Sequence, residues 1–418
     1  MSDQVASLQD QVSSIPERLS LVAPLRVRNF RYLWIGQHIS LIGDQFKFVA
    51  LSWLVLSLTG RSGALGTVLM LQAIPRSILM LMGGVVSDRL RPRTVMLFSD
   101  FFRAAVVGTI AILTVTGQIT MTYVYVLSLL FGIVHAFFFP AASAMTPELV
   151  EPHLLRPANA VNQVTSQIVL SAAPGLAGLV IAAVGTAGGF AVDAASFLIS
   201  AFFLLLIVTA PRQRVAGRQS PWRDLVEGVA FVKRDRLLMT LIVMASVFFF
   251  GYAGATYVGL PVLVKGPLHS GPQGIGILFS AYGLGALAGG IIGGTIAGRR
   301  RGLLGVGLIA AMGMLIATIA LAQSVWQAAL LLAISGAMIS WVGITFMTLI
   351  QQRADRAYLG RVMGMLMFGI YGLYPVSYGL AGWISEFTGV RTLFVIGGAI
   401  IICSAVAGFS VRELRELD

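Results

Sequence analysis

The chain has 418 residues, of which 57% are hydrophobic and 11% charged, with a formal net charge of +12 and a mean hydropathy of +0.87. Soluble domains carry about 25% charged residues, so this composition excludes an ordinary soluble protein and indicates a membrane protein. The single cysteine, Cys403, excludes an internal disulfide and is expected to be a small core residue. Because the phosphate-loop, zinc and nucleophile motifs of common enzymes are missing from the sequence, we expect neither an enzyme nor an ATPase, and no cofactor or metal.

Apolar segments of the length that a transmembrane helix needs, about 20 residues, recur along the whole chain. Twelve can be placed, centred near residues 45, 75, 104, 132, 172, 198, 248, 285, 312, 335, 372 and 400. The sequence therefore predicts an all-α integral membrane protein with twelve transmembrane helices. Residues 1–28 come before the first span and show no signal-peptide pattern; we expect either a short amphipathic helix on the membrane surface or a disordered segment there.

Arginine is concentrated in alternate loops, at residues 18–31, 89–93, 212–236, 299–301, 353–361 and 412–415. The positive-inside rule then places both termini in the cytoplasm and the protein in the cell (inner) membrane as a multi-pass protein. Because the basic charge marks topology, nucleic acid is not expected as a partner. The expected partners are a small-molecule substrate, protons and membrane lipid, and we expect a monomer.

The longest polar stretch, residues 210–236, divides the chain into two halves of six spans, residues 29–209 and 237–411, with a cytoplasmic tail at 412–418. The motif "VRNFRYLW" before span one is echoed by "VKRDRLLM" before span seven, and "GGVVSDRLR" by "GGTIAGRRR". We therefore predict a duplicated unit that forms two six-helix bundles, with a substrate site between them. Glycines at four-residue spacing, such as Gly285 and Gly289, indicate close helix packing, which is either static or slides between states.

Ionisable residues inside a bilayer cost about 2.5–3.5 kcal/mol each, so they are functional candidates. They are few and lie in the N-terminal half: His38, Asp44, Lys47, Arg76, Asp100, Arg103 and His135. Asp44 and Arg76 each lie about 18 Å into a span, near the midplane, and we expect them to pair directly or through water. Such a pair either couples transport to protons or locks two helices permanently. Lys47 is a rival partner, and His135 either titrates or bridges helices.

Two motifs resemble those of the major facilitator superfamily of transporters. "GGVVSDRLRPR" is similar to the motif after the second helix of that family, with matches at Gly84, Asp88, Arg89 and Arg93. "SAAPGLAGL" resembles the helix-five signature of the antiporter branch, with matches at Pro174 and Gly178. Longer stretches, such as "NFRYLWIGQHISLIGDQFKFVALSWLVLSLTG", look like the subgroup of macrolide efflux pumps and enterobactin-type siderophore exporters. One departure is Ser128, which stands where many drug antiporters of the family carry an arginine.

The first motif crowds charges into the loop between spans two and three. The resemblance implies that Asp88 receives hydrogen bonds from the start of span eleven, just after Arg361. We expect a cytoplasmic gate that closes in the outward-open state and is formed by Gly84, Asp88, Arg89, Arg93, Asp100, Arg103 and Arg361. Topology signalling is the alternative, although it accounts for the arginines and not for Asp88 or Asp100.

Aromatic residues on the inner spans suggest a bulky, partly apolar cargo. The candidate cavity residues are Phe138, Phe250, Trp341, Tyr371, Tyr374 and Tyr378, and contact with lipid is the alternative role for each. The sequence thus favours a secondary transporter that exports amphipathic drugs or metabolites by proton antiport with alternating access. A siderophore or lysolipid transporter on the same scaffold and a transport-inactive membrane receptor remain alternatives.

Overall fold

The computed structural model describes residues 22–89, 91–208, 230–293, 301–353 and 358–415, and every regular element in these ranges is helical. The expected N-terminal segment lies mostly outside them, as does most of the expected linker. Up to residue 208 the elements are η1 (Ala23–Arg26), α2 (Arg28–Thr59), α3 (Ser62–Arg89), α4 (Pro92–Val115), α5 (Met121–Leu149), η2 (Pro152–Leu154) and α6 (Leu155–Leu206). From residue 230 they are α8 (Arg236–Ala253), η3 (Gly254–Gly259), α9 (Leu260–Lys265), α10 (Pro272–Gly293), α11 (Arg301–Thr318), η4 (Ile319–Leu321), α12 (Val325–Arg353), α13 (Leu359–Gly372), α14 (Tyr374–Thr388), α15 (Val390–Phe409) and α16 (Arg412–Arg415).

Most of these helices are long and apolar enough to cross a membrane. Within the described residues, ten candidate spans meet that criterion. The longest element, α6, has 52 residues, which corresponds to about 78 Å at 1.5 Å per residue, well over twice the thickness of a hydrocarbon core. It bends at Gly185, whose φ of 79° is one that glycine adopts without strain. The chain is therefore a multi-pass membrane protein.

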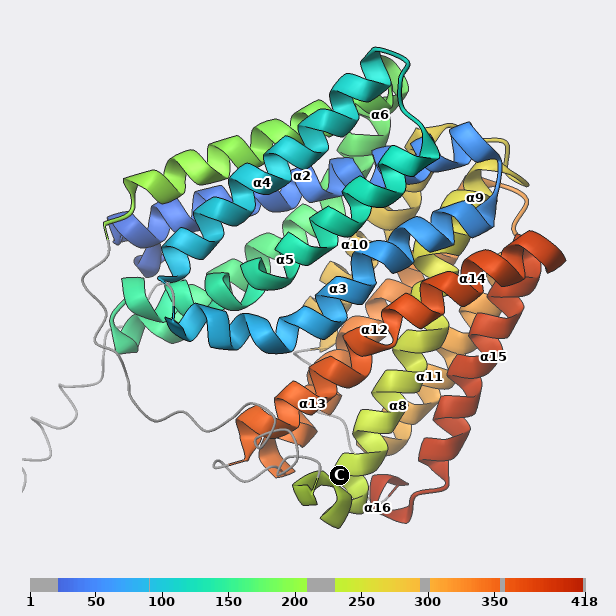
Figure 1. Cartoon of the computed structure of the whole chain (residues 1–418). Helices are drawn as coiled ribbons and strands as arrows, with labels where there is room; N and C mark the ends of the chain where they lie inside the picture. Colours follow the sequence, from blue (N-terminus) through green and yellow to red (C-terminus); the bar gives the residue numbers. More distant parts are fainter. Residues whose placement is uncertain (1–21, 90, 209–229, 294–300, 354–357, 416–418) are drawn as a thin grey trace, which may run out of the picture.

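The helices pack in two neighbourhoods that follow the order of the chain (Figure 1). In the first, α2 lies along α6, α3 lies along α5, and α4 contacts both α5 and α6. In the second, α10 lies along α12 and α11 along α15, while α8 contacts α15. Two long contacts join the neighbourhoods, one between α3 and α14 and the other between α6 and α10. The residues that could act between the two parts should therefore lie along these contacts.

Glycine allows several of these helices to approach closely. A Cβ atom added to Gly285 or Gly289 of α10 would overlap the backbone of Ala333 or Ala337 of α12, so this glycine pair serves the packing of α10 on α12. Near the middle of α2, Gly43 faces α6 in the same way, where an added Cβ would lie 2.8 Å from the Cβ atom of Ser196.

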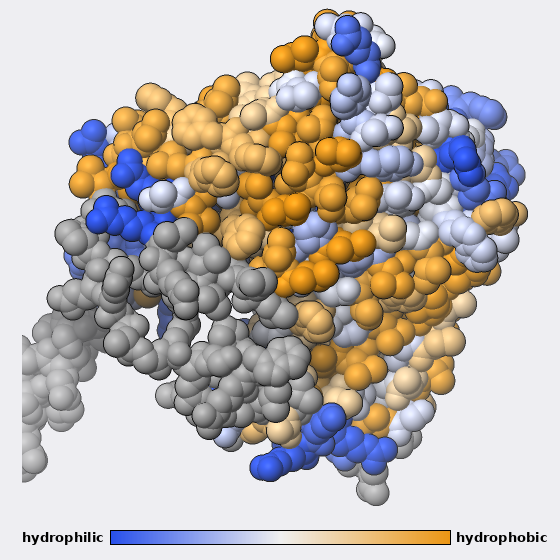
Figure 2. Space-filling view, viewed as in Figure 1, coloured by the Kyte–Doolittle hydropathy of each residue, from blue (hydrophilic) through white to orange (hydrophobic). Residues whose placement is uncertain are grey.

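The surface matches a lipid environment along the sides of the helices. Large hydrophobic side chains are exposed there, among them Phe98, Ile112, Trp326 and Phe387. On the face shown in Figure 2, hydrophobic residues cover the flanks and most hydrophilic residues gather toward the helix ends. Cys403 on α15 is also exposed, so the expectation that it belongs to the core is wrong; a thiol is apolar enough to face lipid.

Candidate transport site

An ion pair between a buried lysine and a half-buried aspartate occupies the middle of α2. The Nζ atom of Lys47 lies 2.7 Å from Oδ1 of Asp44, one turn away, and Lys47 is only 8% exposed. The same Nζ atom lies 3.4 Å from the ring centroid of Phe131 on α5, where the π face of the ring attracts a cation. The expectation of a direct pair between Asp44 and Arg76 is therefore not met, because Lys47, on the same helix face, reaches the carboxylate first.

Arg76 lies instead at the contact between α3 and α13. Its guanidinium carbon is 5.3 Å from the ring centroid of Tyr371, and the neighbouring Ser77 hydroxyl donates to the backbone carbonyl of Tyr371 at 3.0 Å. Pro75 lies just before Arg76 inside α3, where the ring cannot donate a backbone hydrogen bond. Arg76 is thus a cation that lies over an aromatic ring of the other neighbourhood of helices.

Asp100 and Arg103 form a second buried ion pair, within α4. Their side chains are 0% and 1% exposed, and the hydroxyl of Ser200 on α6 donates to Oδ2 of Asp100 at 2.7 Å. The guanidinium carbon of Arg103 lies 4.0 Å from the ring centroid of Phe138 and 4.2 Å from that of Phe197. This pair binds α4 to α5 and α6. It is not part of a gate toward span eleven in this structure, because its partners all come from the first neighbourhood.

Of the remaining residues of the expected gate, Arg93 and Arg361 have described side chains, whereas the three residues in α3 do not. Arg93 donates from Nε to the carbonyl of Leu204 at 2.8 Å and from Nη2 to that of Leu205 at 2.9 Å, so it binds the end of α6. Arg361, near the start of α13, lies with its guanidinium carbon 5.2 Å from the ring centroid of Tyr358. Gly84, Asp88 and Arg89 belong to α3, in a part whose side chains lie outside the described ones, so their gate role stays a prediction.

Two further titratable groups lie inside the first neighbourhood. The ring of His135 stacks on Phe131 with centroids 5.8 Å apart, and its buried Nδ1 atom has no hydrogen-bond partner among the described residues. Asp193 of α6 is 0% exposed, and neither of its carboxyl oxygens has such a partner there. The sequence argument missed Asp193, although a carboxylate inside the apolar stretch "FAVDAASFLISAFFL" is the same signal that singled out Asp44.

Aromatic rings gather where the two neighbourhoods meet. Tyr374 lies 5.3 Å from Tyr371 and 5.6 Å from Tyr378 between ring centroids, and Tyr378 lies 5.9 Å from Tyr257 of the second neighbourhood. Tyr257 in turn lies 5.6 Å from Phe48 of α2. These five rings, called the aromatic cluster below, join α2 to the helices of the second neighbourhood. Of the other expected cavity residues, Phe138 packs on Arg103, Trp341 is buried in the core, and the carbonyl of Phe250 accepts a hydrogen bond from Ser377.

The helices beside the aromatic cluster are interrupted. Between α8 and α9 the chain forms a π-helical turn, Gly254–Gly259, a feature that often marks functional sites. The Ser377 hydroxyl donates to the carbonyl of Phe250 at 2.6 Å and accepts from the N–H of Gly254 at 2.9 Å, so it holds the start of this turn. A second interruption separates α13 from α14 at Leu373, before Pro375. Broken helices of this kind supply binding sites in many transporters.

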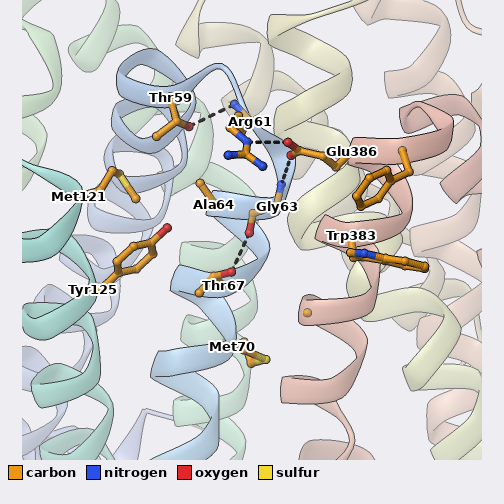
Figure 3. A pocket seen from close by; sticks show the side chains of 12 residues that line it. Thr59, Arg61, Gly63, Ala64, Thr67, Met70, Met121, Tyr125, Trp383 and Glu386 are labelled. Atoms are coloured by element: carbon orange, nitrogen blue, oxygen red, sulfur yellow. Dashed lines mark hydrogen bonds and ion pairs between the residues drawn. The ribbon is translucent and has the colours of Figure 1, made fainter.

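At one end of the helices, an ion pair bridges the two neighbourhoods. Nε of Arg61, between α2 and α3, lies 2.6 Å from Oε1 of Glu386 on α14, and the N–H of Gly63 donates to Oε2 at 2.8 Å (Figure 3). The hydrogen bond to Glu386 and its negative charge raise the pKa of Arg61 above its ordinary value. We call this end of the molecule the Arg61 end. A pocket of ≈ 690 Å³ opens beside the ion pair and is lined by Met70, Tyr125 and Trp383 among others.

The contact between α6 and α10 contains both residues of the antiporter-type motif. A Cβ atom at Gly178 would lie 2.9 Å from the Cα atom of Gln273, and a Cβ atom at Gly276 would overlap the carbonyl oxygen of Pro174. Nearby, the Ser280 hydroxyl accepts from the N–H of Gly175 at 2.9 Å. The motif therefore lets the backbones of α6 and α10 touch, so the second contact between the neighbourhoods depends on small residues at these positions.

At the opposite end, Asp235 caps α8 and bridges to α12. Its Oδ1 atom accepts from the N–H groups of Leu237 and Leu238 at 3.0 and 3.1 Å, and Oδ2 lies 2.8 Å from Nε of Arg353. Partial burial alone would raise the pKa of Asp235, but the hydrogen bonds from Arg353 and from the helix N-terminus lower it below its ordinary value. We call this end the Asp235 end.

Long apolar helices, a buried set of charges and an aromatic cluster between two groups of helices define a membrane transporter. The family model described as "Transmembrane secretion effector" matches residues 19–418, and the chain belongs to this family of MFS transporters, which are not enzymes. Macrolide efflux protein A of Streptococcus pyogenes is 24% identical over 395 residues, 93% of this chain and 97% of that protein. Multidrug efflux pump Tap of Mycolicibacterium fortuitum is 26% identical over 394 residues, 90% of this chain and 94% of that protein.

A solved structure shows the same fold. The bacterial homologue of the iron transporter ferroportin, in its inward-facing state, superposes with a TM-score of 0.73 and covers 91% of this chain and 98% of its own length. The two sequences are 14% identical. The chain therefore has the fold of MFS-like transporters, and its relatives support a role as an efflux transporter.

Proposed function

We propose that this protein exports amphipathic small molecules of the drug or secondary-metabolite type by proton antiport with alternating access. The relatives named for macrolide and multidrug efflux support the cargo class. The aromatic cluster supports it too, because tyrosine and phenylalanine rings offer stacking area with few fixed polar groups, as a bulky and partly apolar cargo needs.

The proposed topology has twelve spans in two six-helix bundles, residues 29–209 and 237–411, linked by residues 210–236. Two features bring the ten candidate spans to twelve. The bend at Gly185 divides α6 into two crossings, and α3 adds another, since its 28 residues are long enough to span. The Arg-rich loops place both termini and the tail at 412–418 on the cytoplasmic side of the inner membrane, with the Asp235 end inside and the Arg61 end outside.

In this proposed orientation, two contacts support an outer side that is closed. The ion pair of Arg61 and Glu386 and the hydrogen bond from Lys265 to Ser57, at 2.5 Å, both join the two bundles at the Arg61 end. Export then requires these contacts to separate while the cytoplasmic side closes. The proposed cytoplasmic gate retains Asp88 with Gly84 and Arg89, and Arg361 supplies the side of span eleven.

Asp44 is the proposed proton-coupling residue, and its buried ion pair with Lys47 is the observation that carries this proposal. A proton on Asp44 would cancel the attraction for Lys47, and loss of that proton would restore it. The ion pair can therefore exist in only one protonation state, so a change in proton access between the two sides of the membrane changes the structure around α2. His135 lies near enough to interact electrostatically with Asp44, and Arg76 with His135, so these two are the proposed auxiliary residues.

The test uses everted vesicles that are energised and report their pH gradient through a fluorescent dye. Macrolides, tetracyclines, cationic dyes and a catecholate siderophore are added in turn to vesicles with native protein or with Asp44→Asn. We expect at least one compound to dissipate the gradient with the native protein and to lose this effect in Asp44→Asn. The matched control is Glu151→Gln, which removes an exposed carboxylate outside the spans.

Each outcome decides between alternatives. A compound that moves protons equally well with native protein and with Asp44→Asn would show that Asp44 is structural. Transport of the siderophore alone would narrow the cargo to that class. A protein that binds compounds but moves neither protons nor compound across the membrane would be a receptor, and the proposed function would be wrong.

A further inference from the structure

Asp193 is a buried carboxyl group that the proposed coupling step does not use. It lies on α6 at 0% exposure, and both of its carboxyl oxygens are without a hydrogen-bond partner among the described residues. An isolated carboxylate in such surroundings is costly by several kcal/mol, so this position requires a proton or a nearby cation.

The hydroxyl beside Asp193 indicates which of these is present. The side chain of Ser196, one turn along α6, donates its hydrogen to the backbone carbonyl of Asp193 at 2.7 Å. With that hydrogen engaged, the hydroxyl oxygen can only accept. The Ser196 hydroxyl therefore gives the carboxyl oxygens of Asp193 no hydrogen bond in this structure, and the protonated form of this group is the one that needs no charged partner.

The cation within reach is Lys47. A Cβ atom at Gly43 of α2 would lie 2.6 Å from Oδ1 of Asp193, so the carboxyl group rests against the backbone of α2 at that residue. Lys47 is one turn further along the same face, and long side chains on a helix lean toward its N-terminus, here toward Gly43 and Asp44. Gly43 has no side chain, and the space that a Cβ atom would take there is occupied by the Ser196 hydroxyl and by Oδ1 of Asp193, so these groups lie against the face of α2 that carries Lys47.

The other charged groups near Asp193 are either paired with another residue or interact electrostatically with Asp44. Asp193 interacts electrostatically with Lys47 and Asp44 of α2 and with Arg103 of α4, and Arg103 is paired with Asp100. His135 of α5 interacts with Asp44 and Lys47. Among these groups, Lys47 is the cation that pairs with Asp44 and also interacts electrostatically with Asp193.

We propose that Asp44 and Asp193 share one proton and one ammonium group, that of Lys47. In one arrangement Lys47 pairs with Asp44 and the proton is on Asp193. In the other arrangement the proton is on Asp44 and Lys47 pairs with the carboxylate of Asp193. The exchange moves one proton from one carboxyl oxygen to another and leaves the total charge unchanged. No buried charge is left unpaired in either arrangement, so Lys47 can leave Asp44 at little cost.

This inference rests on the proposed coupling role of Asp44 and names the group that accepts Lys47 when Asp44 is protonated. The test is infrared spectroscopy of the full-length protein in lipid vesicles without cargo, because the C=O stretching band of a protonated carboxylic acid is separate from that of a carboxylate. The native protein should show a buried acid band at neutral pH, and Asp193→Asn should lose it.

Two further variants distinguish sharing from a passive buried acid. Asp44→Asn should also lose the band, because Lys47 then passes to Asp193 and ionises it. Lys47→Met should increase the band about twofold, because without the ammonium both carboxyl groups hold protons. Glu151→Gln is the control and should leave the band unchanged. Should Asp193→Asn fail to fold, Asp193→Glu carries the test, because the longer acid should shift the band.

A band that survives in Asp193→Asn, or stays in place in Asp193→Glu, would overturn the proposal, as would its persistence in Asp44→Asn. The spectra require no transport, so the two proposals can fail separately. If Asp44→Asn loses proton-coupled transport but keeps the acid band, the proton is not shared while the coupling role stands. If the band disappears as expected but transport is unaffected, Asp44 and Asp193 share a proton that does not drive export.

Discussion

Arg61 and Glu386 are 325 positions apart in the sequence, yet their side chains meet at 2.6 Å and join α3 to α14 (Figure 3). Both residues belong to segments between or at the ends of spans, where water screens charge, so the ion pair alone contributes little to stability. Its value lies in position, because it sits where the two groups of helices must separate if the Arg61 end is to open.

Charge reversal tests this ion pair. Arg61→Glu should place two carboxylates together, favour separation of α3 from α14, and shift the protein toward a state with an open Arg61 end. Arg61→Glu combined with Glu386→Arg should restore the native distribution. Spin labels at Thr59 and Phe387, in a Cys403→Ser background, report the distance by electron resonance. An unchanged distance distribution in Arg61→Glu would show that the ion pair does not hold this end closed.

Close backbone contact between α6 and α10 gives a second prediction. A Cβ at Gly178 would lie 2.9 Å from the backbone of α10, so Gly178→Leu must push the two helices apart. We expect at least a tenfold loss of transport, while Gly307→Leu, at an open position of α11, should retain it. Drug efflux from cells, corrected for the amount of protein in the membrane, measures both. Equal activity of the two variants would contradict a role for this contact.

The buried pair in α4 predicts a large change in stability. Arg103→Met would leave the carboxyl of Asp100 without its charge partner and with only Ser200 as a donor. Breaking a buried ion pair in this way costs about 3–5 kcal/mol. The thermal unfolding of purified protein in detergent should show a clear fall in Tm, and Asp100→Asn combined with Arg103→Met should recover part of it. A Tm equal to that of the native protein would mean that the pair adds nothing.

At the Asp235 end, titration of Asp235 should make the stability of the protein depend on pH. Its pKa lies below its ordinary value, so its contribution is fully present above the unfolded value of about 3.9 and is lost as the pH falls through the folded pKa. Asp235→Ala removes the helix cap and should cost about 0.5–2 kcal/mol near neutral pH. The difference in Tm between native protein and variant should shrink as the pH falls below about 4. A difference that stays constant with pH would exclude this titration.

The sequence could predict the helices, because a span is defined by apolar length and needs no knowledge of its neighbours. It could also point to the close packing at Gly285 and Gly289, since small residues at fixed spacing mark such packing whatever the partner. It could not predict which cation binds Asp44. That choice depends on the rotation of α2 and on the ring of Phe131, which holds Lys47 in place.

The charges near the motif "GGVVSDRLRPR" also show what could not be predicted from the sequence. Asp100 and Arg103 lie three residues apart and close in sequence to Asp88, so sequence proximity suggested one network. A helix turns by about 100° per residue, and α4 directs this pair inward against α5 and α6. Sequence distance therefore did not reveal that Asp100 and Arg103 pair with each other and pack against α5 and α6.

The contacts at the Arg61 end also determine how far the other end can open. With 32 residues, α2 extends about 48 Å from this fixed end, so a rotation of only about 10° displaces its far end by about 8 Å. The helix then works as a lever with its pivot at the membrane surface. Small changes in helix packing near the pivot would be amplified at the far end of α2, and the length of this helix would set the size of molecule that can enter.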